Sequence, residues 1–179
     1  HQFMREIWAS LRLSFITSIA TTFLALVIAV PAAYALSRFK YPFPMIVDTI
    51  LDLPIVLPPL VAGVALLTVT RYWLGPLFDA MGIQLHYTPR GIVVAQLFIA
   101  APFAVRAIKA AFDDISPRYE EVARTLGCTR FQAFFHVSLP LARHGILAGA
   151  IMTWARAVSE FGPILIFCGA SEKTAVLPI

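Results

Sequence analysis

Two opposite charges interrupt an apolar segment near the end of the chain. Arg156 and Glu160 lie within an otherwise hydrophobic stretch from residue 145 to residue 169. A charge near the centre of a membrane helix costs about 2.5–3.5 kcal/mol on insertion scales, and two residues four positions apart can pair on one helical face. The pair predicts either a polar transport path or its gate, with Arg156 as a transient contact for a dianion, or a structural ion pair within the helix or between subunits. A tightly held dianion would leave slowly, which favours the structural pair.

The sequence contains none of the residue arrangements that common enzymes use. It has no G-x4-G-K-[ST] loop to hold ATP phosphates, so we do not expect it to hydrolyse ATP. Ser159 and Glu160 have no histidine at a plausible depth for nucleophilic catalysis. The four histidines are His1, His86, His136 and His144. They are too scattered for a metal site, so we predict a subunit that is not an enzyme and holds no metal or cofactor.

The composition places the chain in a membrane. Of its 179 residues 59% are hydrophobic and 13% are charged, whereas about a quarter of the residues in a soluble domain are charged. The apolar residues arrive in long blocks, so the lipid bilayer is the expected solvent. The formal net charge of +4 is typical of Lys and Arg retained in cytoplasmic loops. We expect a multi-pass protein of the cell membrane and no nucleic-acid partner.

Four apolar blocks predict four transmembrane helices in one all-α membrane domain, residues 1–179. The blocks span residues 13–36, 46–69, 91–108 and 145–169. As a helix, the first would be about 36 Å long, enough to cross the bilayer. Residues 1–12 are typical of a short amphipathic helix that lies at the outer interface without crossing. The chain begins at His1 and ends at Ile179 without a polar tail, so we expect a fragment of a longer protein.

The second block contains prolines that exclude a straight helix. Asp48 and Asp52 lie on one helical face and precede Pro54, Pro58 and Pro59. Prolines leave backbone carbonyls that neighbouring helices or a wet cavity must satisfy. We therefore expect a kinked segment inside the bundle. Pro54 and Pro58 either line a translocation path or gate, or only pack within the kink.

The distribution of basic residues predicts which loops are cytoplasmic. With four crossings, residues 37–45 and 109–144 lie on one side, and the N-terminus and residues 70–90 lie on the other. The first two loops hold seven Lys and Arg residues, and the other two segments hold four. Because cytoplasmic loops are enriched in these residues, we expect residues 109–144 to be cytoplasmic.

The long loop at residues 109–144 is patterned as two short amphipathic helices joined by a glycine. Ser116 and Pro117 supply an N-cap and a first-turn proline, and Glu120 and Glu121 follow where a helix N-terminus favours negative charge. The first apolar stripe is formed by Tyr119, Val122, Ala123 and Leu126. Gly127 then allows a tight turn.

The second helix of this loop follows the glycine. Thr129 can cap it, and Leu139-Pro140 ends it. Its apolar stripe is formed by Phe131, Phe134 and Phe135. A rigid helical elbow with an apolar face suits docking into a groove of a partner subunit, from where force passes to the attached membrane helices. A helical hairpin lying on the membrane surface fits the same pattern.

The loop also resembles a known family. The segments EVARTLG at residues 121–127 and VSLP at residues 137–140 are similar to the EAA signature of ABC importer permeases, E-A-A-x3-G-x9-I-x-L-P, with Val122 and Val137 as small apolar departures. The resemblance implies a helical bundle of the type I ABC importer permease kind, whose coupling helix docks into a cleft of a separate cytoplasmic ATPase. The implied coupling residues are Glu121, Ala123, Leu126, Gly127, Phe131, Leu139 and Pro140.

Two further segments resemble one branch of that family. Residues 52–63 and 148–162 are similar to the permeases for molybdate, tungstate and sulfate. The resemblance implies ATP-driven uptake of an oxyanion, with molybdate or tungstate ahead of sulfate or thiosulfate. It also implies three partners: a cytoplasmic ABC ATPase dimer that binds the ATP, a second permease subunit of the same or related sequence, and an external substrate-binding protein that selects the anion.

Two other classes of function compete with this interpretation. An ion channel or secondary transporter not coupled to ATP needs its own selectivity filter or ion-coupling carboxylates within broken helices. Asp48, Asp52 and Glu160 are the candidate carboxylates. A membrane-embedded enzyme needs a nucleophile, metal cluster or acid/base pair in one place, and the sequence shows none.

Overall fold

The computed structural model describes residues 2–39, 43–73, 88–160 and 162–168, and every regular element in these ranges is helical. The α-helices are α1 (Gln2–Arg38), α2 (Pro44–Val56), α3 (Pro59–Thr68), α5 (Pro89–Asp113), α6 (Arg118–Thr125), α7 (Arg130–Ala133), α8 (Leu139–Leu141), α9 (Arg143–Ser159) and α10 (Gly162–Cys168). Two π-helical turns, η1 (Val69–Trp73) and η2 (Phe134–Ser138), continue α3 and α7. The predicted all-α class is confirmed.

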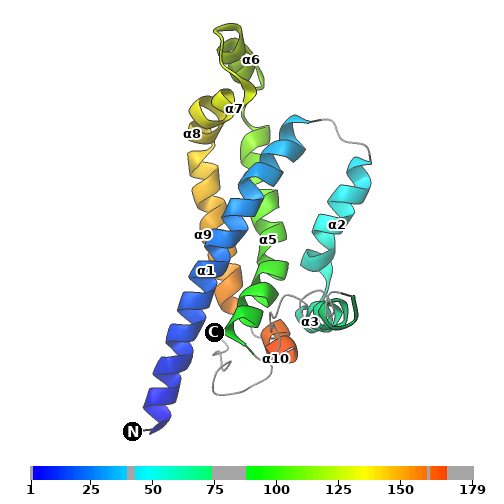
Figure 1. Cartoon of the computed structure of the whole chain (residues 1–179), viewed down its shortest axis with the longest axis vertical. Helices are drawn as coiled ribbons and strands as arrows, with labels where there is room; N and C mark the ends of the chain where they lie inside the picture. Colours follow the sequence, from blue (N-terminus) through cyan, green and yellow to red (C-terminus); the bar gives the residue numbers. More distant parts are fainter. Residues whose placement is uncertain (1, 40–42, 74–87, 161, 169–179) are drawn as a thin grey trace.

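The long helices α1, α5 and α9 lie side by side and form the centre of the molecule (Figure 1). Ala25, Ala29 and Ala33 repeat every four residues on α1 and are fully buried. They share one core cluster with the buried Ile108 and Phe112 of α5. In lipid, helices associate through close packing of small side chains, so this alanine stripe determines how closely α1 approaches its neighbours.

A polar chain of hydrogen bonds joins the three long helices. The buried Thr21 Oγ1 of α1 donates to Gln96 Oε1 of α5 at 2.9 Å, and Gln96 Nε2 donates to the carbonyl oxygen of Ala157 in α9 at 2.9 Å. Within a bilayer no water satisfies such groups. The amide of Gln96 therefore fixes the register of α1 and α9 relative to α5.

Two glycines let α9 approach α5 closely. A Cβ atom added at Gly145 would lie 2.2 Å from Ala111 Cβ, and one added at Gly149 would lie 3.0 Å from Ile108 Cγ1. The pair forms a G-x-x-x-G pattern, which is typical of close helix contacts in membranes. Sequence analysis did not single out this pattern, although its spacing is visible in the sequence.

Replacing Gly145 by valine is expected to destabilise the bundle by about 1–3 kcal/mol, the usual cost of overpacking. The new side chain would collide with Ala111, so α9 must move away from α5. Ala148 is exposed on the same helix, and its replacement by valine is the matched control. Thermal unfolding in detergent compares the two variants. Equal midpoints would contradict the close contact.

The second apolar block is broken, as its prolines predicted. The helical path bends by 116° between α2 and the segment Pro59–Trp73, which contains α3 and η1. Leu57 and Pro58 both have extended backbones, with ψ of 138°, because a residue that precedes a proline is driven out of the helical region. Pro59 then begins α3, where its missing amide hydrogen costs nothing.

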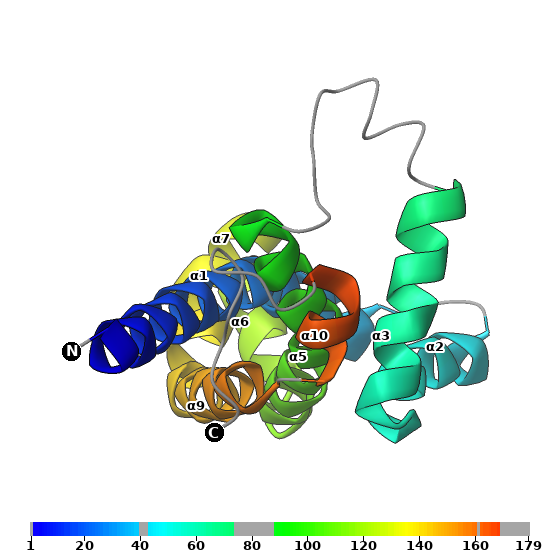
Figure 2. The same ribbon diagram turned by 90° about the horizontal axis from the view of Figure 1, so that it is seen from below.

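Helix α10 packs against α3 at one end of the bundle (Figure 2). A Cβ atom on Gly63 of α3 would lie 2.8 Å from Pro163 Cα, and one on Gly162 of α10 would lie 3.2 Å from Leu60 Cδ2. The two short helices therefore touch almost backbone to backbone. Each of them follows a break in a longer apolar block, so this contact joins the two interrupted segments.

Three expected boundaries differ from the structure. Residues 2–12 do not form a separate helix, because α1 runs without a break from Gln2 to Arg38. Helix α5 runs from Pro89 to Asp113, beyond the expected 91–108 at both ends. The expected crossing at residues 145–169 is interrupted, since α9 ends at Ser159 and α10 begins at Gly162.

Among the described residues, fewer helices than the four expected are long and apolar enough to cross a membrane. By length and composition, two helices of the described chain, Ile7–Arg38 within α1 and α5, can cross a membrane, and the bent pair Pro44–Val56 and Pro59–Trp73 would make a third. Helix α9 has 17 residues, because the chain leaves the helical conformation at Glu160. The orientation inferred from four crossings therefore stays a prediction.

Candidate functional site

The segment between α5 and α9 forms an elbow that projects from one end of the bundle (Figure 1). We use the name elbow for residues 116–142, which contain α6, α7, η2 and α8. Ser116 and Pro117 precede α6, and Glu120 and Glu121 lie in its first turn, as the sequence predicted. The turn between the two arms lies at Gly127.

Gly127 ends α6 in a left-handed conformation, with φ of 94°. Its amide donates to Arg124 O at 3.1 Å, and the amide of Cys128 donates to Ala123 O at 3.1 Å. This pair of bonds is the Schellman arrangement, which satisfies the last carbonyls of a helix. The predicted turn is therefore a defined helix end, and its backbone conformation favours glycine.

The second arm starts with a reciprocal cap. Thr129 Oγ1 accepts from the amide of Gln132 at 3.3 Å, and Gln132 Oε1 accepts from the amide of Thr129 at 2.8 Å. The helical path then continues through η2 into α8 and ends at Leu141. The helical path therefore ends one residue beyond the expected Leu139-Pro140. Pro140 occupies an early position of α8, where no amide donor is needed.

Glu120 fastens the elbow to α1. Its Oε1 accepts from Arg38 Nε at 2.7 Å and from Ser138 Oγ at 2.6 Å, and its Oε2 accepts from Tyr34 Oη at 2.7 Å. Arg38 also donates to the carbonyl oxygen of Ile115 at 2.9 Å. The side chains of Arg38 and Glu120 are only 9% and 13% exposed. One carboxylate therefore holds together α1, α6 and η2.

Sequence analysis assigned the coupling role to Glu121 and missed Glu120 as an anchor. Glu121 is exposed and has no ion-pair partner among the described residues. Glu120 contacts Tyr34 and Arg38, more than 80 positions earlier in the chain. No local pattern reports such a distant contact, so only the fold distinguishes the two glutamates.

The pKa of Glu120 lies below its ordinary value of 4.5. Burial by itself raises this pKa, but hydrogen bonds from Ser138, Tyr34 and Arg38 and the charge of Arg38 outweigh that effect. Because the folded pKa is depressed, the carboxylate stabilises the elbow fully above the unfolded pKa, and this stabilisation is lost as pH falls through the folded pKa.

Acidification is therefore expected to loosen the elbow below about pH 4.5. Hydrogen exchange of the α6 amides, followed from about pH 7 downward and corrected for the intrinsic rate, measures this change. The Glu120→Gln variant is expected to have lost the pH-dependent part already. An identical acid profile in both proteins would contradict the role of Glu120.

The three phenylalanines of the second arm do not share one face. Phe134 is half-buried and packs on Tyr34 and Phe112, with ring centroids 4.5 and 6.3 Å away. Phe131 and Phe135 are exposed, and their ring centroids lie 4.7 Å apart. The prediction that all three rings form one outward-facing stripe is therefore wrong for Phe134, which packs against α1 and α5. Phe131 and Phe135 do face outward.

The elbow carries several exposed apolar side chains on its outer surface. Leu126 is 82% exposed and Phe131 is 73% exposed. Tyr119, Val122 and Phe135 are exposed as well. Of the other implied coupling residues, Pro140 is exposed, and Ala123 and Leu139 are half-buried. We call the five exposed apolar residues Tyr119, Val122, Leu126, Phe131 and Phe135 the apolar tip.

A cleft of about 270 Å³ separates the end of α1 from the elbow. Its lining includes Phe39 and two basic residues, Arg124 and Arg130. Neither arginine has an ion-pair partner within the described ranges. Glu120 and Glu121 line it as well. The cleft is therefore a charged recess beside the apolar tip.

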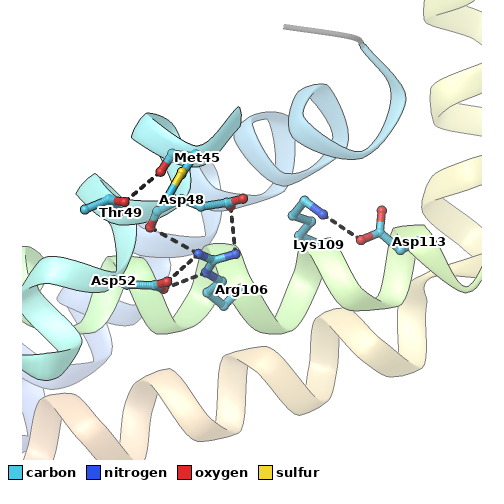
Figure 3. Close-up of polar contacts among 7 residues, drawn as sticks. All are labelled: Met45, Asp48, Thr49, Asp52, Arg106, Lys109 and Asp113. Carbon is cyan, nitrogen blue, oxygen red and sulfur yellow. Dashed lines mark hydrogen bonds and ion pairs between the residues drawn. The ribbon is translucent and has the colours of Figure 1, made fainter. Parts of the chain in front are cut away.

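Arg106 of α5 pairs with both carboxylates of α2 (Figure 3). Its Nε and Nη2 contact Asp52 Oδ1 at 2.9 Å and Oδ2 at 2.8 Å, and its Nη1 donates to Asp48 Oδ1 at 2.9 Å. Nη2 also donates to the carbonyl oxygen of Asp48 at 3.1 Å. The two carboxylates singled out for ion coupling are therefore engaged by an arginine.

Arg156 and Glu160 pair as their spacing predicted. Arg156 Nη2 lies 2.7 Å from Glu160 Oε1, and the Arg156 guanidinium lies 5.4 Å from the ring centroid of Phe103. The Glu160 side chain is 3% exposed and that of Arg156 is 31% exposed. Neither Glu160 Oε1 nor Arg156 Nε makes a well-aligned hydrogen bond in the described part of the chain, so charge holds this contact more than alignment does.

The two prolines expected at a path or gate lie on opposite sides of one break. Pro54 is buried in the last turn of α2, and Pro58 is exposed in the extended link to α3. Glu160 lies at the other break, between α9 and α10. Because α3 and α10 pack together, both breaks lead into the same pair of short helices.

Comparison with known proteins identifies the family. Residues 25–177 match the family described as binding-protein-dependent transport system inner membrane component. The chain belongs to this family. The match includes the elbow, the Arg156–Glu160 pair and both broken segments. The family assignment and the all-helical bundle with its elbow agree with the predicted permease fold.

Named relatives carry the comparison further. The chain is 41% identical over 168 residues to the molybdate/tungstate transport system permease protein WtpB of Thermococcus kodakarensis, covering 94% of this chain and 64% of that protein. It is 34% identical to the sulfate transport system permease protein CysW of Synechocystis, covering 98% and 64%. It is 36% identical to the molybdenum transport system permease protein ModB of Escherichia coli, covering 89% and 71%. The chain thus spans about two thirds of the length of these relatives.

Proposed function

We propose that this chain is the core of a permease subunit that imports a tetrahedral oxyanion, driven by ATP hydrolysis in a separate subunit. The single observation that carries the proposal is the elbow, a rigidly fastened projection with an uncovered apolar tip, in a chain of the binding-protein-dependent transporter family. Molybdate or tungstate is the favoured substrate, with sulfate or thiosulfate next, because the similar proteins carry these names.

The apolar tip is the proposed contact with a cytoplasmic ABC ATPase dimer. Leu126 and Phe131 offer apolar area that a partner groove can bury. The Schellman turn at Gly127 and the cap at Thr129 keep the two arms in a fixed relation. Movement of the docked ATPase is then transmitted to α5 and α9 through the continuous chain, and to α1 through the contacts of Glu120 with Tyr34 and Arg38.

The two broken segments are the proposed gate of the translocation path. Arg156, Glu160, Pro54 and Pro58 lie at or beside the breaks that lead into α3 and α10. In the whole assembly a second permease subunit supplies the other wall, and an external binding protein delivers the anion. Rocking of the packed pair α3–α10 is the proposed opening movement.

An ATP-independent channel or secondary carrier is the competing function. Its ion-coupling carboxylates would need to be free to bind and release an ion. Asp48 and Asp52 are both bound to Arg106, and Glu160 faces Arg156. These contacts favour the importer over the carrier.

Uptake into vesicles tests the proposal. The full-length subunit is reconstituted with its ATPase and binding protein, and labelled molybdate and sulfate are supplied outside, with or without internal ATP. We expect accumulation of one anion that requires both ATP and the binding protein. Flux that persists without ATP would instead support a channel or secondary carrier.

A further inference from the structure

Arg106 of α5 and Arg156 in the last turn of α9 differ in how many of their guanidinium donors are paired. Arg106 contacts two carboxylates, and Asp52 fills the edge formed by Nε and Nη2 with both of its oxygens. Among the described residues, Arg156 pairs with one carboxylate, that of Glu160, which lies 2.7 Å from Nη2. Arg106 and its two carboxylates therefore carry a net negative charge, whereas Arg156 and Glu160 together are neutral. If Glu160 moves away, the guanidinium of Arg156 becomes an unpaired cation.

The guanidinium of Arg156 has an unused donor. Its Nε is buried and has no hydrogen-bond partner within the described chain, although Nη2 on the same edge meets Glu160 Oε1. The Nε and Nη2 hydrogens point in parallel and match two oxygens of one carboxylate, phosphate or related oxyanion. The edge that Asp52 fills completely on Arg106 is thus half-filled on Arg156.

Glu160 lies where it can withdraw. It is the first residue after α9, with an extended backbone at ψ of 106°, so a backbone rotation at this position moves its side chain without unwinding the helix. The guanidinium of Arg156 remains over Phe103, whose ring face attracts a cation. Arg156 is therefore held in position while its carboxylate exchanges.

We propose that the Nε–Nη2 edge of Arg156 is a transient binding site for the transported tetrahedral oxyanion, and that Glu160 is the internal carboxylate that the anion displaces and that later displaces it. The inference rests on the proposed function. It gives Glu160 a definite task, which is to prevent the dianion from staying on Arg156. Capture and release then use the same cation with two competing anions.

The Glu160→Gln variant tests the exchange because the proposal predicts opposite signs for two measurements. The complex of full-length permease and ATPase is placed in nanodiscs without binding protein, and equilibrium binding of labelled molybdate and sulfate is measured. We expect about tenfold tighter binding than in the wild type, since a competing charge is removed. The rate of ATP-driven uptake is expected to fall, because release becomes slow.

Two arginine variants complete the test. Arg156→Gln is expected to abolish anion binding, and Arg156→Lys is expected to weaken it, because lysine retains the charge but lacks the two-donor edge. A purely structural ion pair would lower assembly, binding and uptake together in every variant, and this outcome would overturn the proposal. If Glu160→Gln does not assemble, Glu160→Asp provides the same comparison, with a shorter carboxylate that competes less well.

The controls separate this inference from the function on which it rests. Wild-type complexes that show no ATP-dependent oxyanion uptake would refute the proposed function itself. Wild-type complexes that transport normally, together with a Glu160→Gln variant that binds the anion no more tightly, would refute only the exchange at Arg156. Ala148→Val, an exposed change in α9 outside the proposed gate, controls for general effects of substitution in the helix that carries Arg156.

Discussion

Replacing Glu120 by alanine is expected to uncouple the transporter by tenfold or more. The change leaves Arg38 as a nearly buried cation without its carboxylate, and it removes the acceptor of Tyr34 and Ser138. Breaking a buried ion pair by removing one partner costs about 3–5 kcal/mol. This cost falls on the junction between the elbow and α1, so the elbow should move without α1 and ATP hydrolysis should continue without proportionate uptake.

The measurement is the ratio of anion imported to ATP hydrolysed in reconstituted vesicles. Hydrogen exchange of the α6 amides in the same protein should be faster, because the elbow opens more often. Asp114→Ala is the matched control, since Asp114 is exposed beside the elbow and its side chain forms no ion pair among the described residues. A normal ratio in the Glu120 variant would show that α1 does not take part in coupling.

Replacing Gly127 by valine is expected to produce the second large loss. A Cβ atom at this position meets nothing within 4 Å, so no collision contributes to the effect. The cost comes from the φ of 94°, a conformation that is unfavourable by about 1–2 kcal/mol for a residue with a side chain and worse for a β-branched one. Relief of this strain is expected to change the angle between α6 and α7 and thereby the relative positions of the exposed Leu126 and Phe131.

Docking of the ATPase measures this effect directly. Pull-down of the ATPase by the Gly127→Val complex should fall several-fold, and uptake should fall with it. Gly127→Asn is the control, because asparagine tolerates the left-handed region better than other residues with side chains. Retained docking and uptake in the valine variant would count against the fixed elbow as the coupling device.

Local chemistry predicted the breaks and turns of this fold well. The consecutive prolines at 58 and 59 predicted the interruption between α2 and α3, and Gly127 predicted the turn of the elbow. Both features depend on the φ and ψ preferences of one or two residues. Such preferences act within the chain segment itself, so a sequence reports them without knowledge of the tertiary contacts.

Contacts between distant segments were harder to predict. No local pattern favours Glu120 over Glu121 as the anchor, because the partners of Glu120 are Tyr34 and Arg38 on another helix. Phe134 was expected to share an outward face with Phe131, and its inward direction depends on Phe112 and Tyr34. In both cases the deciding neighbour lies outside any helical window.

The end of α9 shows an intermediate case. A continuous apolar block concealed the break after Ser159, since hydropathy does not distinguish a helix from an extended link in lipid. Gly162 and Pro163 nevertheless follow the break directly, and a proline near a helix start is a recognisable signal. Attention to these two residues would have placed the boundary correctly.

The uninterrupted length of α1 has a consequence for its place in the bilayer. Thirty-seven residues extend about 55 Å, whereas the hydrocarbon layer is about 30 Å thick and the headgroups bring the total to about 40–45 Å. A helix that long either tilts strongly or carries its first turns past the headgroups into water. Because Arg38 is tied to the elbow at one end, the excess length of an untilted α1 would emerge at the other end. Its N-terminal turns would then extend beyond the headgroups on the side of the membrane opposite the elbow.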